Sequence, residues 1–570
     1  MSPVNPVAAS HEFSVYRMQQ YDLHSVPHGS RSSSFNLEGR SLTSWSTSRH
    51  CVVARIQDIT IEQFIEIRGK AGALLLILPK NDTALTNEEK EHIQLLEMAM
   101  VQQEISAPVY FAKWTPEFED ILLDLQHSFI TDDKAGTALE AMLNTVSSNG
   151  YQIGKLNVLH FKSLESRAVT IHARLAGRAP ALTTVVLVAH YDSAALVPVS
   201  EPTIPSHTPR NTNCKITTDV LQTVERSGQT SSSATRHDPH LFIALVTPLS
   251  TGADSNGSGA VAVLELARIF SRLYAGAAGR GAANIVFALM SSGHSLNYFS
   301  AKKWLEEQLD STEAALLQDV SFVMCLDSIS SSPNLTMHVS KPPAAGSAAH
   351  SIKTRLGVPH VHKKINLADE VLAWHHERFS IRRMTAFTLS SRQSHKDPAR
   401  SSILDSPSEE GLQNLISNIA STARALASHI YNLTDEGSDE DRLLYDEALG
   451  VDAAAVRHWY SYLASQPRSP QLVTTVPPNA GISAALERLL SRHAASTAAA
   501  HAADKREPEY TLYGPTAATL YVYSVKPAVF DLILTVAIVA YLAVVYFAIQ
   551  LFPAFYEEYA KFVTGKAKVH

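Results

Sequence analysis

The stretch "TTVVLVAHYDS" (residues 183–193) decides the fold class. It begins as an almost unbroken run of apolar residues and ends in the polar residues His190 and Asp192. A strand that is apolar on both sides belongs to a sheet whose two faces are both covered. Ligands bind at the carboxyl ends of the strands in such sheets, so His190 and Asp192 lie where a functional site is expected.

Helical and strand patterns alternate downstream of this stretch. "VAVLELARIFSRLY" (261–274) and "YFSAKKWLEEQL" (298–309) predict helices, whereas "NIVFALMSS" (284–292) and "VSFVMCLDS" (320–328) predict strands. This alternation predicts an α/β fold in which a mostly parallel sheet is sandwiched by helices. We assign this domain to residues 166–436.

The regions around this domain differ from it in composition. Residues 11–165 mix short apolar runs with helical segments, which predicts a smaller N-terminal α/β lobe. Residues 197–250 are rich in Ser, Thr and Pro and show little periodicity, so we expect a disordered insertion. Residues 437–525 are Ala-rich with proline breaks, which predicts a helical juxtamembrane region.

The C-terminus carries a candidate membrane span. Residues 532–549, "LILTVAIVAYLAVVYFAI", contain no charge, and about 18 such residues can cross a bilayer. We predict a single transmembrane helix over 528–552, in contact with membrane lipid, and a tail over 553–570; a buried core helix is the alternative. Lysines are in excess after the span, which places the tail in the cytosol and the body in the lumen.

The start of the chain does not match that topology. Residues 1–23, "MSPVNPVAASHEFSVYRMQQYDL", have neither the charged nor the apolar region of a signal peptide. Either the first exon is missing from this sequence, or the protein is tail-anchored with a cytosolic body, which is the rival interpretation. Asn-X-Ser/Thr sequons tip the balance slightly toward the lumen. The glycosylation candidates are Asn81, Asn256, Asn334 and Asn432.

Composition narrows the classes of function. The net charge is −7 and no basic stripe interleaved with aromatic residues is present, so we predict no nucleic-acid binding. The three cysteines are widely separated and form neither a zinc pattern nor a dense disulfide framework.

Polar residues follow several of the predicted strands. His190, Asp327 and His395 each come after a strand, and Asp254 lies in the turn "GADSNGSG" (252–259) before a helix. Two imidazoles and two carboxylates at one sheet edge suit a divalent metal such as zinc, and Asp192 is placed to orient the His190 ring.

Each of these residues also has a simpler interpretation. Asp254 alone is more readily explained as a helix N-cap, His190 as a hydrogen-bonded core histidine, and Asp327 as an ordinary strand-end residue. The turn lacks the lysine of a phosphate-binding loop, and no G-x-S-x-G nucleophile motif is present.

The motifs "HYD", "GADSNGSG", "LDS" and "SHKD" resemble the M28-type zinc aminopeptidases. In that family two metals share a bridging aspartate, and a pair of glutamates supplies a general base and a ligand. The resemblance implies that His190, Asp254 and Asp327 match the ligands of one metal, and Asp254 and His395 two ligands of the other. The glutamate pair is missing, because no Asp or Glu occurs between Glu265 and Glu306.

The loop "MSSGHSLNYFS" (290–300) stands where the glutamates are expected. His294 is a candidate substitute ligand there, although we expect an exposed loop residue. Loss of the base argues against peptide hydrolysis. We expect the turn at 252–259 to keep the old architecture, with Asp254 capping the helix and no cofactor bound except, at most, one residual zinc.

Longer segments, among them "HEFSVYRMQQYDL", "LELARIFSRLY", "HVSKPP" and "SVKPAVFDL", resemble the nicalin family of nicastrin-like proteins. The resemblance covers nearly the whole chain. It implies a non-catalytic, single-pass glycoprotein of the endoplasmic reticulum membrane, with a lumenal body and a cytosolic C-terminus.

The partners that the resemblance implies are the Nodal modulator protein and a small multi-pass membrane protein, acting at the ribosome-translocon assembly. The implied roles are the biogenesis of multi-pass membrane proteins and modulation of Nodal signalling. The rival function is an active zinc metallopeptidase that uses His294 or another residue as its base.

Overall fold

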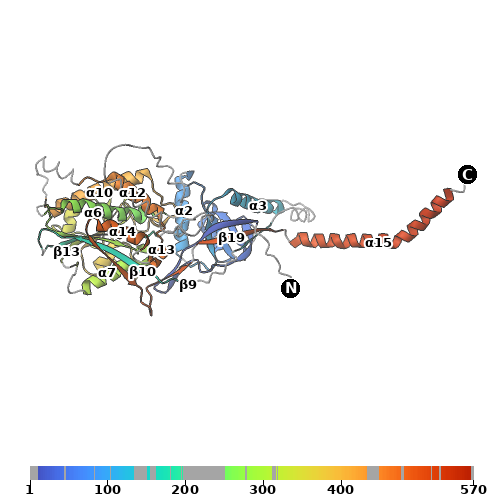
Figure 1. The fold of residues 1–570 in the computed structure, drawn as a ribbon, viewed down its shortest axis with the longest axis horizontal. Coiled ribbons are helices and arrows are strands. Elements are labelled where there is room, and N and C mark those ends of the chain that lie inside the picture. Colours follow the sequence, from blue (N-terminus) through green and yellow to red (C-terminus); the bar gives the residue numbers. More distant parts are fainter. Residues whose placement is uncertain are drawn as a thin grey trace.

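The computed structural model describes most of the chain. It covers residues 10–566 except 44–46, 82–83, 103, 134–149, 155–161, 180–181, 194–195, 197–250, 277–278, 311–315, 318, 433–448, 477–479, 515–516 and 526–527. The insertion predicted at 197–250 lies outside the described residues. Within the described residues the chain forms two lobes and a long C-terminal helix (Figure 1).

The larger lobe is built on an eight-stranded sheet in the order β15-β14-β16-β13-β11-β12-β10-β17. Its strands are β10 (Arg167–Leu175), β11 (Thr184–His190), β12 (Asn284–Met290), β13 (Val320–Leu326), β14 (Thr336–Val339), β15 (His360–His362), β16 (Ala386–Ser390) and β17 (Ala495–Ala502). The central strands β16, β13, β11 and β12 are parallel, and so are the edge strands β14 and β15 to each other. The pairs β10–β12, β10–β17 and β14–β16 are antiparallel. The sheet is therefore mixed, and the prediction of a mostly parallel sheet is not confirmed.

Helices cover both faces of this sheet. They are α6 (Gly259–Leu273), α7 (Phe299–Asp310), α8 (Ala348–Leu356), α9 (His376–Ile381), α10 (Glu409–Ile430), α12 (Ala453–Ser465), α13 (Pro470–Thr475) and α14 (Gly481–Ser491). Successive residues of β11 enter different cores: Val185 and Leu187 pack with α6 and α10, whereas Val186 and Val188 pack with α7. This two-sided burial is why β11 is apolar throughout.

The smaller lobe is a closed barrel in the order β1-β19-β8-β4-β5-β6-β7. Its strands are β1 (His11–Arg17), β4 (Asn36–Ser41), β5 (Cys51–Arg55), β6 (Ala73–Ile77), β7 (Val109–Ala112), β8 (Gly150–Gly154) and β19 (Ala517–Val525), and its helices are α1 (Ile61–Ile67), α2 (Asn87–Val101) and α3 (Pro116–Asp133). A capping box of Thr86 and Glu89 begins α2.

The region predicted to be helical over 437–525 is helical only in its first part. Strands β17, β18 (Tyr510–Gly514) and β19 occupy its end. β17 joins the large sheet, β18 joins a small sheet with β2 (Gln20–Leu23), β3 (Val26–Gly29) and β9 (Lys162–Ser163), and β19 closes the barrel between β1 and β8. The alanines of β17 adopt a strand because β10 supplies a complete antiparallel partner.

The final helix, α15 (Ala528–Lys566), extends away from both lobes (Figure 1). Within the described part of the chain it is the one helix long and apolar enough to cross a membrane, with a mean hydropathy of 2.7 over its best window and none of that window buried. It contains Pro553. It follows the barrel strand β19 after two residues, so the barrel lies beside the candidate span (Figure 1).

Candidate functional site

The structure brings four of the predicted site residues to one edge of the large sheet. β11 and β13 are adjacent and parallel, so His190 and Asp192 at the end of one strand meet Asp327 at the end of the other. Asp254 comes from the turn Ala253–Ser258 that leads into α6. All four side chains are buried.

His190 lies between two carboxylates. Its Nδ1 is 3.0 Å from Oδ1 of Asp192, and its Nε2 is 3.6 Å from Oδ2 of Asp327. Burial alone would lower the pKa of His190, but the two carboxylates outweigh it and raise that pKa to about 9. The other oxygen of Asp192 accepts a hydrogen bond from the Gly293 amide at 2.9 Å, which fixes the carboxylate that orients the ring.

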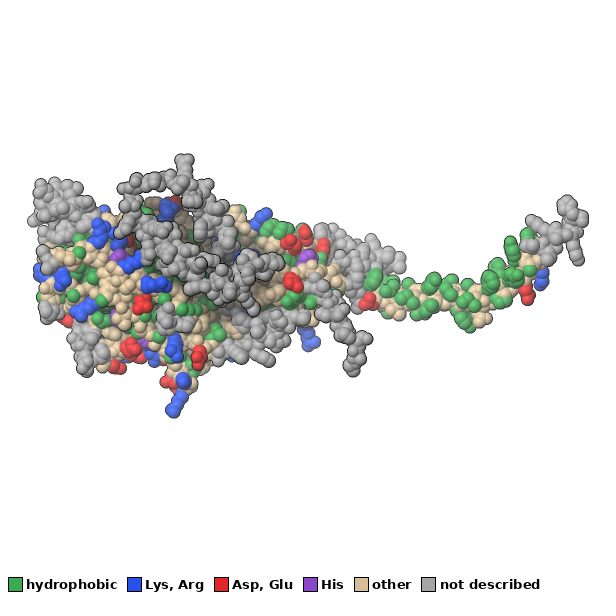
Figure 2. All heavy atoms as spheres, in the orientation of Figure 1, with side chains coloured by type: hydrophobic (Ala, Val, Ile, Leu, Met, Phe, Trp, Pro, Cys, Tyr) green, Lys and Arg blue, Asp and Glu red, His purple; other side chains and the backbone are tan. Residues whose placement is uncertain are grey.

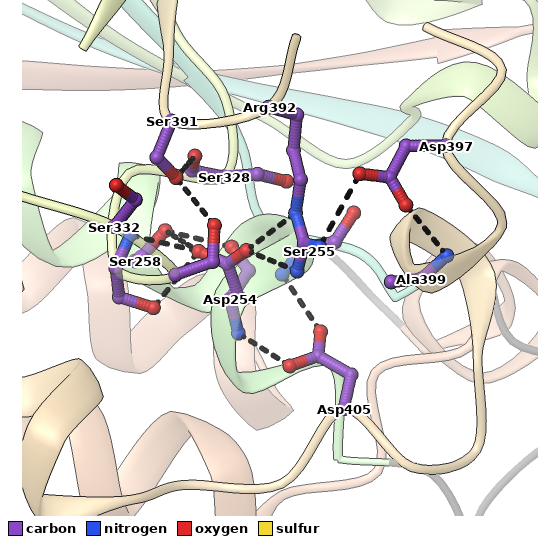
Figure 3. Close-up of polar contacts among 12 residues, drawn as sticks. Asp254, Ser255, Ser258, Ser328, Ser332, Ser391, Arg392, Asp397, Ala399 and Asp405 are labelled. Carbon is purple, nitrogen blue, oxygen red and sulfur yellow. Dashed lines mark hydrogen bonds and ion pairs between the residues drawn. The ribbon is translucent and has the colours of Figure 1, made fainter. Parts of the chain in front are cut away.

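Asp254 is saturated by hydrogen bonds, and the strongest of its partners is an arginine (Figure 3). Its Oδ1 accepts from the Ser330 amide and hydroxyl, both at 2.8 Å, and from the Ser258 hydroxyl at 3.3 Å. Its Oδ2 accepts from Nη2 and Nε of Arg392 at 2.9 and 3.2 Å. Both oxygens of Asp254 are therefore occupied by protein donors.

The expectation that Asp254 caps α6 is wrong. The side chain that accepts from the start of α6 is that of Asn256, whose Oδ1 receives the Gly259 amide at 3.0 Å. The Asp254 backbone is held instead by Asp405, which accepts the amides of Asp254 and Ser255 at 2.8 Å each. Burial and the neighbouring Asp254 raise the pKa of Asp405 to about 6.

Asp327 is also paired with an arginine. Arg400 donates to its Oδ2, and further donates to the Tyr298 hydroxyl at 2.9 Å and the Ala373 carbonyl at 3.0 Å. The guanidinium lies 4.4 Å from the centre of the Trp374 ring. Burial alone would raise the pKa of Asp327, but Arg400 and His190 hold that pKa well below its usual range.

His294 and His395, the two remaining candidate histidines, form no hydrogen bond or ion pair with these carboxylates among the described residues. Partial burial, together with Lys363, Arg400 and Lys396, lowers the pKa of His395 to about 4. The sequence predicted that His294 is an exposed loop residue, and this prediction is wrong: His294 begins a short 3-10 helix and is partly buried. Burial first, and then Arg400, lower the pKa of His294 to about 3.

These donors do not fit a divalent cation. Such an ion needs several free carboxylate or imidazole atoms converging on one point. Here Arg392 and the serines occupy Asp254, Arg400 occupies Asp327, and Asp192 occupies one nitrogen of His190. No group of three or more His, Cys, Asp or Glu side chains in the described parts of the chain is arranged to hold a metal.

The sequons differ in accessibility. Asn256 is fully buried, and its amide nitrogen donates to the carbonyls of Leu326 and His190 at 2.8 and 3.1 Å. A glycan on Asn256 is therefore incompatible with this fold, which corrects its choice as a glycosylation candidate. The other three candidates, Asn81, Asn334 and Asn432, are exposed.

Sequence reasoning missed the residues that organise the site. Arg392, Arg400 and Asp405 all lie in "SRQSHKDPARSSILD" (391–405), a segment chosen only for His395. Arg468 was missed as well; it is fully buried and donates to the carbonyls of Tyr191, Thr251 and Gly252. The one signal available in the sequence was the presence of two arginines, Arg392 and Arg400, in a segment that was already expected at the sheet edge.

Comparisons with known proteins place the chain in a family. No family model matches it. It is 38% identical to the BOS complex subunit ncln of Danio rerio, over 99% of this chain and 94% of that protein, and 36% identical to the BOS complex subunit NCLN of Homo sapiens, over 98% and 92%. It is 28% identical to Nicalin of Caenorhabditis elegans, over 94% and 89%.

Solved structures give a much weaker likeness. An aminopeptidase from Aneurinibacillus sp. strain AM-1 matches 76% of this chain and 84% of its own, at 11% identity and a TM-score of 0.27. This likeness is too weak to support a conclusion about fold or function. The sequence relatives decide the assignment, because their identity exceeds 30% over nearly the full length of both partners. The chain belongs to the nicalin family.

Proposed function

We propose that the chain is a non-catalytic, membrane-anchored subunit of a BOS-type complex. The observation that carries the proposal is the pairing of each candidate metal-binding carboxylate with its own arginine, Arg392 on Asp254 and Arg400 on Asp327. A guanidinium supplies the positive charge that balances a buried carboxylate, but it has no open position for a water or a substrate oxygen.

The loop at residues 290–300, where a catalytic base is expected, is also tightly packed. An added side chain at Gly293 would collide with the His190 ring, since its Cβ would lie 2.4 Å from Nδ1. The neighbouring Ser292 is engaged with Ser300, whose hydroxyl lies 2.6 Å from its own. Without a carboxylate on this loop, hydrolysis loses a contribution of about 10²–10⁴-fold from general base catalysis.

Family membership supports the rest of the proposal. The relatives are named as BOS complex subunits, and we infer the same kind of assembly for this chain. We further infer that its partners are the Nodal modulator protein and a small multi-pass membrane protein at the ribosome-translocon assembly. In this proposal the complex supports multi-pass membrane protein biogenesis in the endoplasmic reticulum and modulates Nodal signalling.

The topology follows from the same proposal. The two lobes lie in the lumen, and the C-terminal tail over 553–570 lies on the cytosolic side. Asn334 and Asn432, which are exposed, are then the sites to examine for N-glycans. Glycans that endoglycosidase removes and that disappear in Asn334→Gln or Asn432→Gln support the lumenal lobes, whereas a wholly unglycosylated protein favours a cytosolic body.

Purification of the full-length chain from detergent-solubilised membranes, followed by mass spectrometry of its partners, tests the assembly. The proposal expects stoichiometric membrane-protein partners, and recovery of the chain alone contradicts it. The rival function, an active zinc metallopeptidase, predicts aminopeptidase turnover with added zinc that His190→Ala abolishes. Such turnover would contradict a purely structural role.

A further inference from the structure

Helix α15 is too long to be a simple membrane span. Its candidate span, Phe530–Phe562, has 33 residues, which corresponds to about 50 Å of helix. A hydrocarbon core is about 30 Å thick, so a straight helix would need a tilt of about 53°, outside the range of about 0–40° that such helices adopt. Part of the helix must therefore lie elsewhere.

Pro553 divides α15 at the length that a bilayer needs. The segment Phe530–Phe552 has 23 residues, or about 35 Å of helix, which spans the core with a tilt of about 31°. Proline removes a backbone hydrogen bond and bends a helix, and Figure 1 shows α15 bent toward its C-terminal end. The bend leaves a concave surface lined by Val545, Ala548, Ile549, Phe552 and Pro553.

The pattern of side chains changes at Pro553. Before it, from Leu532 onward, the helix carries no charged residue, and large apolar side chains occur on all sides. At and beyond it, the large apolar side chains recur at spacings of three, one, three and three residues, which places them on one face. They are Phe552, Phe555, Tyr556, Tyr559 and Phe562, each at least 65% exposed.

The opposite face of this segment is charged. Of the four charged residues of the segment, Glu557 and Lys561 lie opposite the aromatic face on a helical projection, Glu558 lies at the edge of that face, and Lys566 is the last residue of the helix. Figure 2 shows acidic and basic side chains near the free end of α15, after the long apolar stretch. Carboxylates are costly in the hydrocarbon core, whereas Tyr and other aromatic rings favour the headgroup level.

We propose that residues 553–566 form an amphipathic helix that lies in the headgroup region of the bilayer leaflet where the span ends, with the aromatic face toward the acyl chains. The ligand is the lipid surface itself. This inference rests on insertion of α15 in the membrane, not on the non-catalytic role of the lobes.

Charge does not drive this contact. Residues 554–566 contain two Glu and two Lys, so the segment has no net charge. Burial of the aromatic face supplies the binding energy. Binding is therefore expected to be the same on purely phosphatidylcholine membranes and on membranes with added phosphatidylglycerol, at low and high salt.

Depth-dependent quenching in the full-length protein tests the proposal. Single cysteines, Tyr559→Cys on the aromatic face or Glu557→Cys on the charged face, are labelled with an environment-sensitive dye in a Cys214→Ser background; Cys51 and Cys325 are buried. The protein is reconstituted in phosphatidylcholine vesicles, with Leu542→Cys as the mid-span reference. The label at 559 should be quenched by shallow spin-labelled lipid and protected from iodide several-fold better than the label at 557.

The bend is tested with Pro553→Ala, matched by Leu551→Ala, which alters the same turn without changing a proline. Pro553→Ala should expose the label at 559 to iodide, and Leu551→Ala should not. Equal iodide access at 557 and 559 overturns the proposal, as does deep quenching of both positions or an unchanged pattern in Pro553→Ala. Protection of 559 only when partner membrane proteins are present would assign this face to a partner helix and also overturn it.

Discussion

Replacing Arg400 by methionine should destabilise the large lobe strongly. Arg400 is 4% exposed, and its removal leaves the fully buried Asp327 carboxylate without its guanidinium partner. Breaking a buried pair in this way costs about 3–5 kcal/mol, and we expect the lower value because His190 remains 3.6 Å from Asp327. At about 2–4 °C per kcal/mol, the melting temperature should fall by roughly 6–12 °C.

A surface pair provides the matched control. Arg457 and Glu409 form a two-point contact, with both N–O distances at 2.7 Å, but the two side chains are 55% and 61% exposed. Arg457→Met should therefore leave the melting temperature nearly unchanged, because solvent screens this pair, although its geometry is as good as that of the buried pair. Thermal unfolding of the full-length protein in detergent at pH 7 measures both variants.

A double variant distinguishes the loss of the Arg400–Asp327 ion pair from the loss of side-chain packing. The double variant Arg400→Met/Asp327→Asn removes the unpaired charge and should recover part of the stability lost in Arg400→Met. A stabilising role of the buried pair is contradicted if Arg400→Met lowers the melting temperature no more than Arg457→Met. It is also contradicted if the double variant loses as much stability as Arg400→Met and Asp327→Asn lose when added together.

Three further predictions concern buried groups near the interface of the lobes and the site. The pKa of His190 is raised to about 9 in the folded protein, against about 6.5 in the unfolded protein. The stabilising contribution of His190 is therefore complete below pH 6.5 and is lost as the pH rises through 9. His190→Gln should flatten the fall in melting temperature between these two pH values. Burial raises the pKa of Glu97 to about 8, although the hydrogen bonds that Glu97 accepts from Ser402 and Ile403 act in the opposite direction. Stability should therefore fall between about pH 4.5 and 8, because Glu97 loses its proton in the unfolded state but keeps it in the folded state. Glu97→Gln should remove this pH dependence. Asn256→Ala removes the side-chain hydrogen bonds of four buried backbone groups, which costs about 1–3 kcal/mol for each group left without another partner. It should greatly reduce the yield of trypsin-resistant protein, whereas Asn334→Ala should not; equal yields would contradict the buried role of Asn256.

The sequence was informative where one periodicity dominated. The apolar run of β11 and the amphipathic pattern of α6 each follow from burial on two faces or on one, and α15 follows from its uninterrupted apolar length. The strand β17 was not predictable in the same way. Its sequence "ASTAAAHA" favours a helix by propensity, and only pairing with β10 makes it a strand.

The site was predictable in position but not in chemistry. His190, Asp192 and Asp327 were expected at one edge because strand ends converge there, and the parallel pairing of β11 with β13 brings them together. What the carboxylates bind depends on a loop more than 60 residues beyond Asp327 in the chain. No local pattern shows that Arg392 and Arg400 fold back onto Asp254 and Asp327.

The zinc content of the purified full-length protein tests the central claim most directly. Arg392 and Arg400 balance the carboxylates that a metal would otherwise need. We therefore expect far less than one zinc per chain by mass spectrometry of the intact sample, after incubation with zinc and removal of free ion, and no change in His190→Ala. One zinc per chain in the parent protein, lost in His190→Ala, would contradict it.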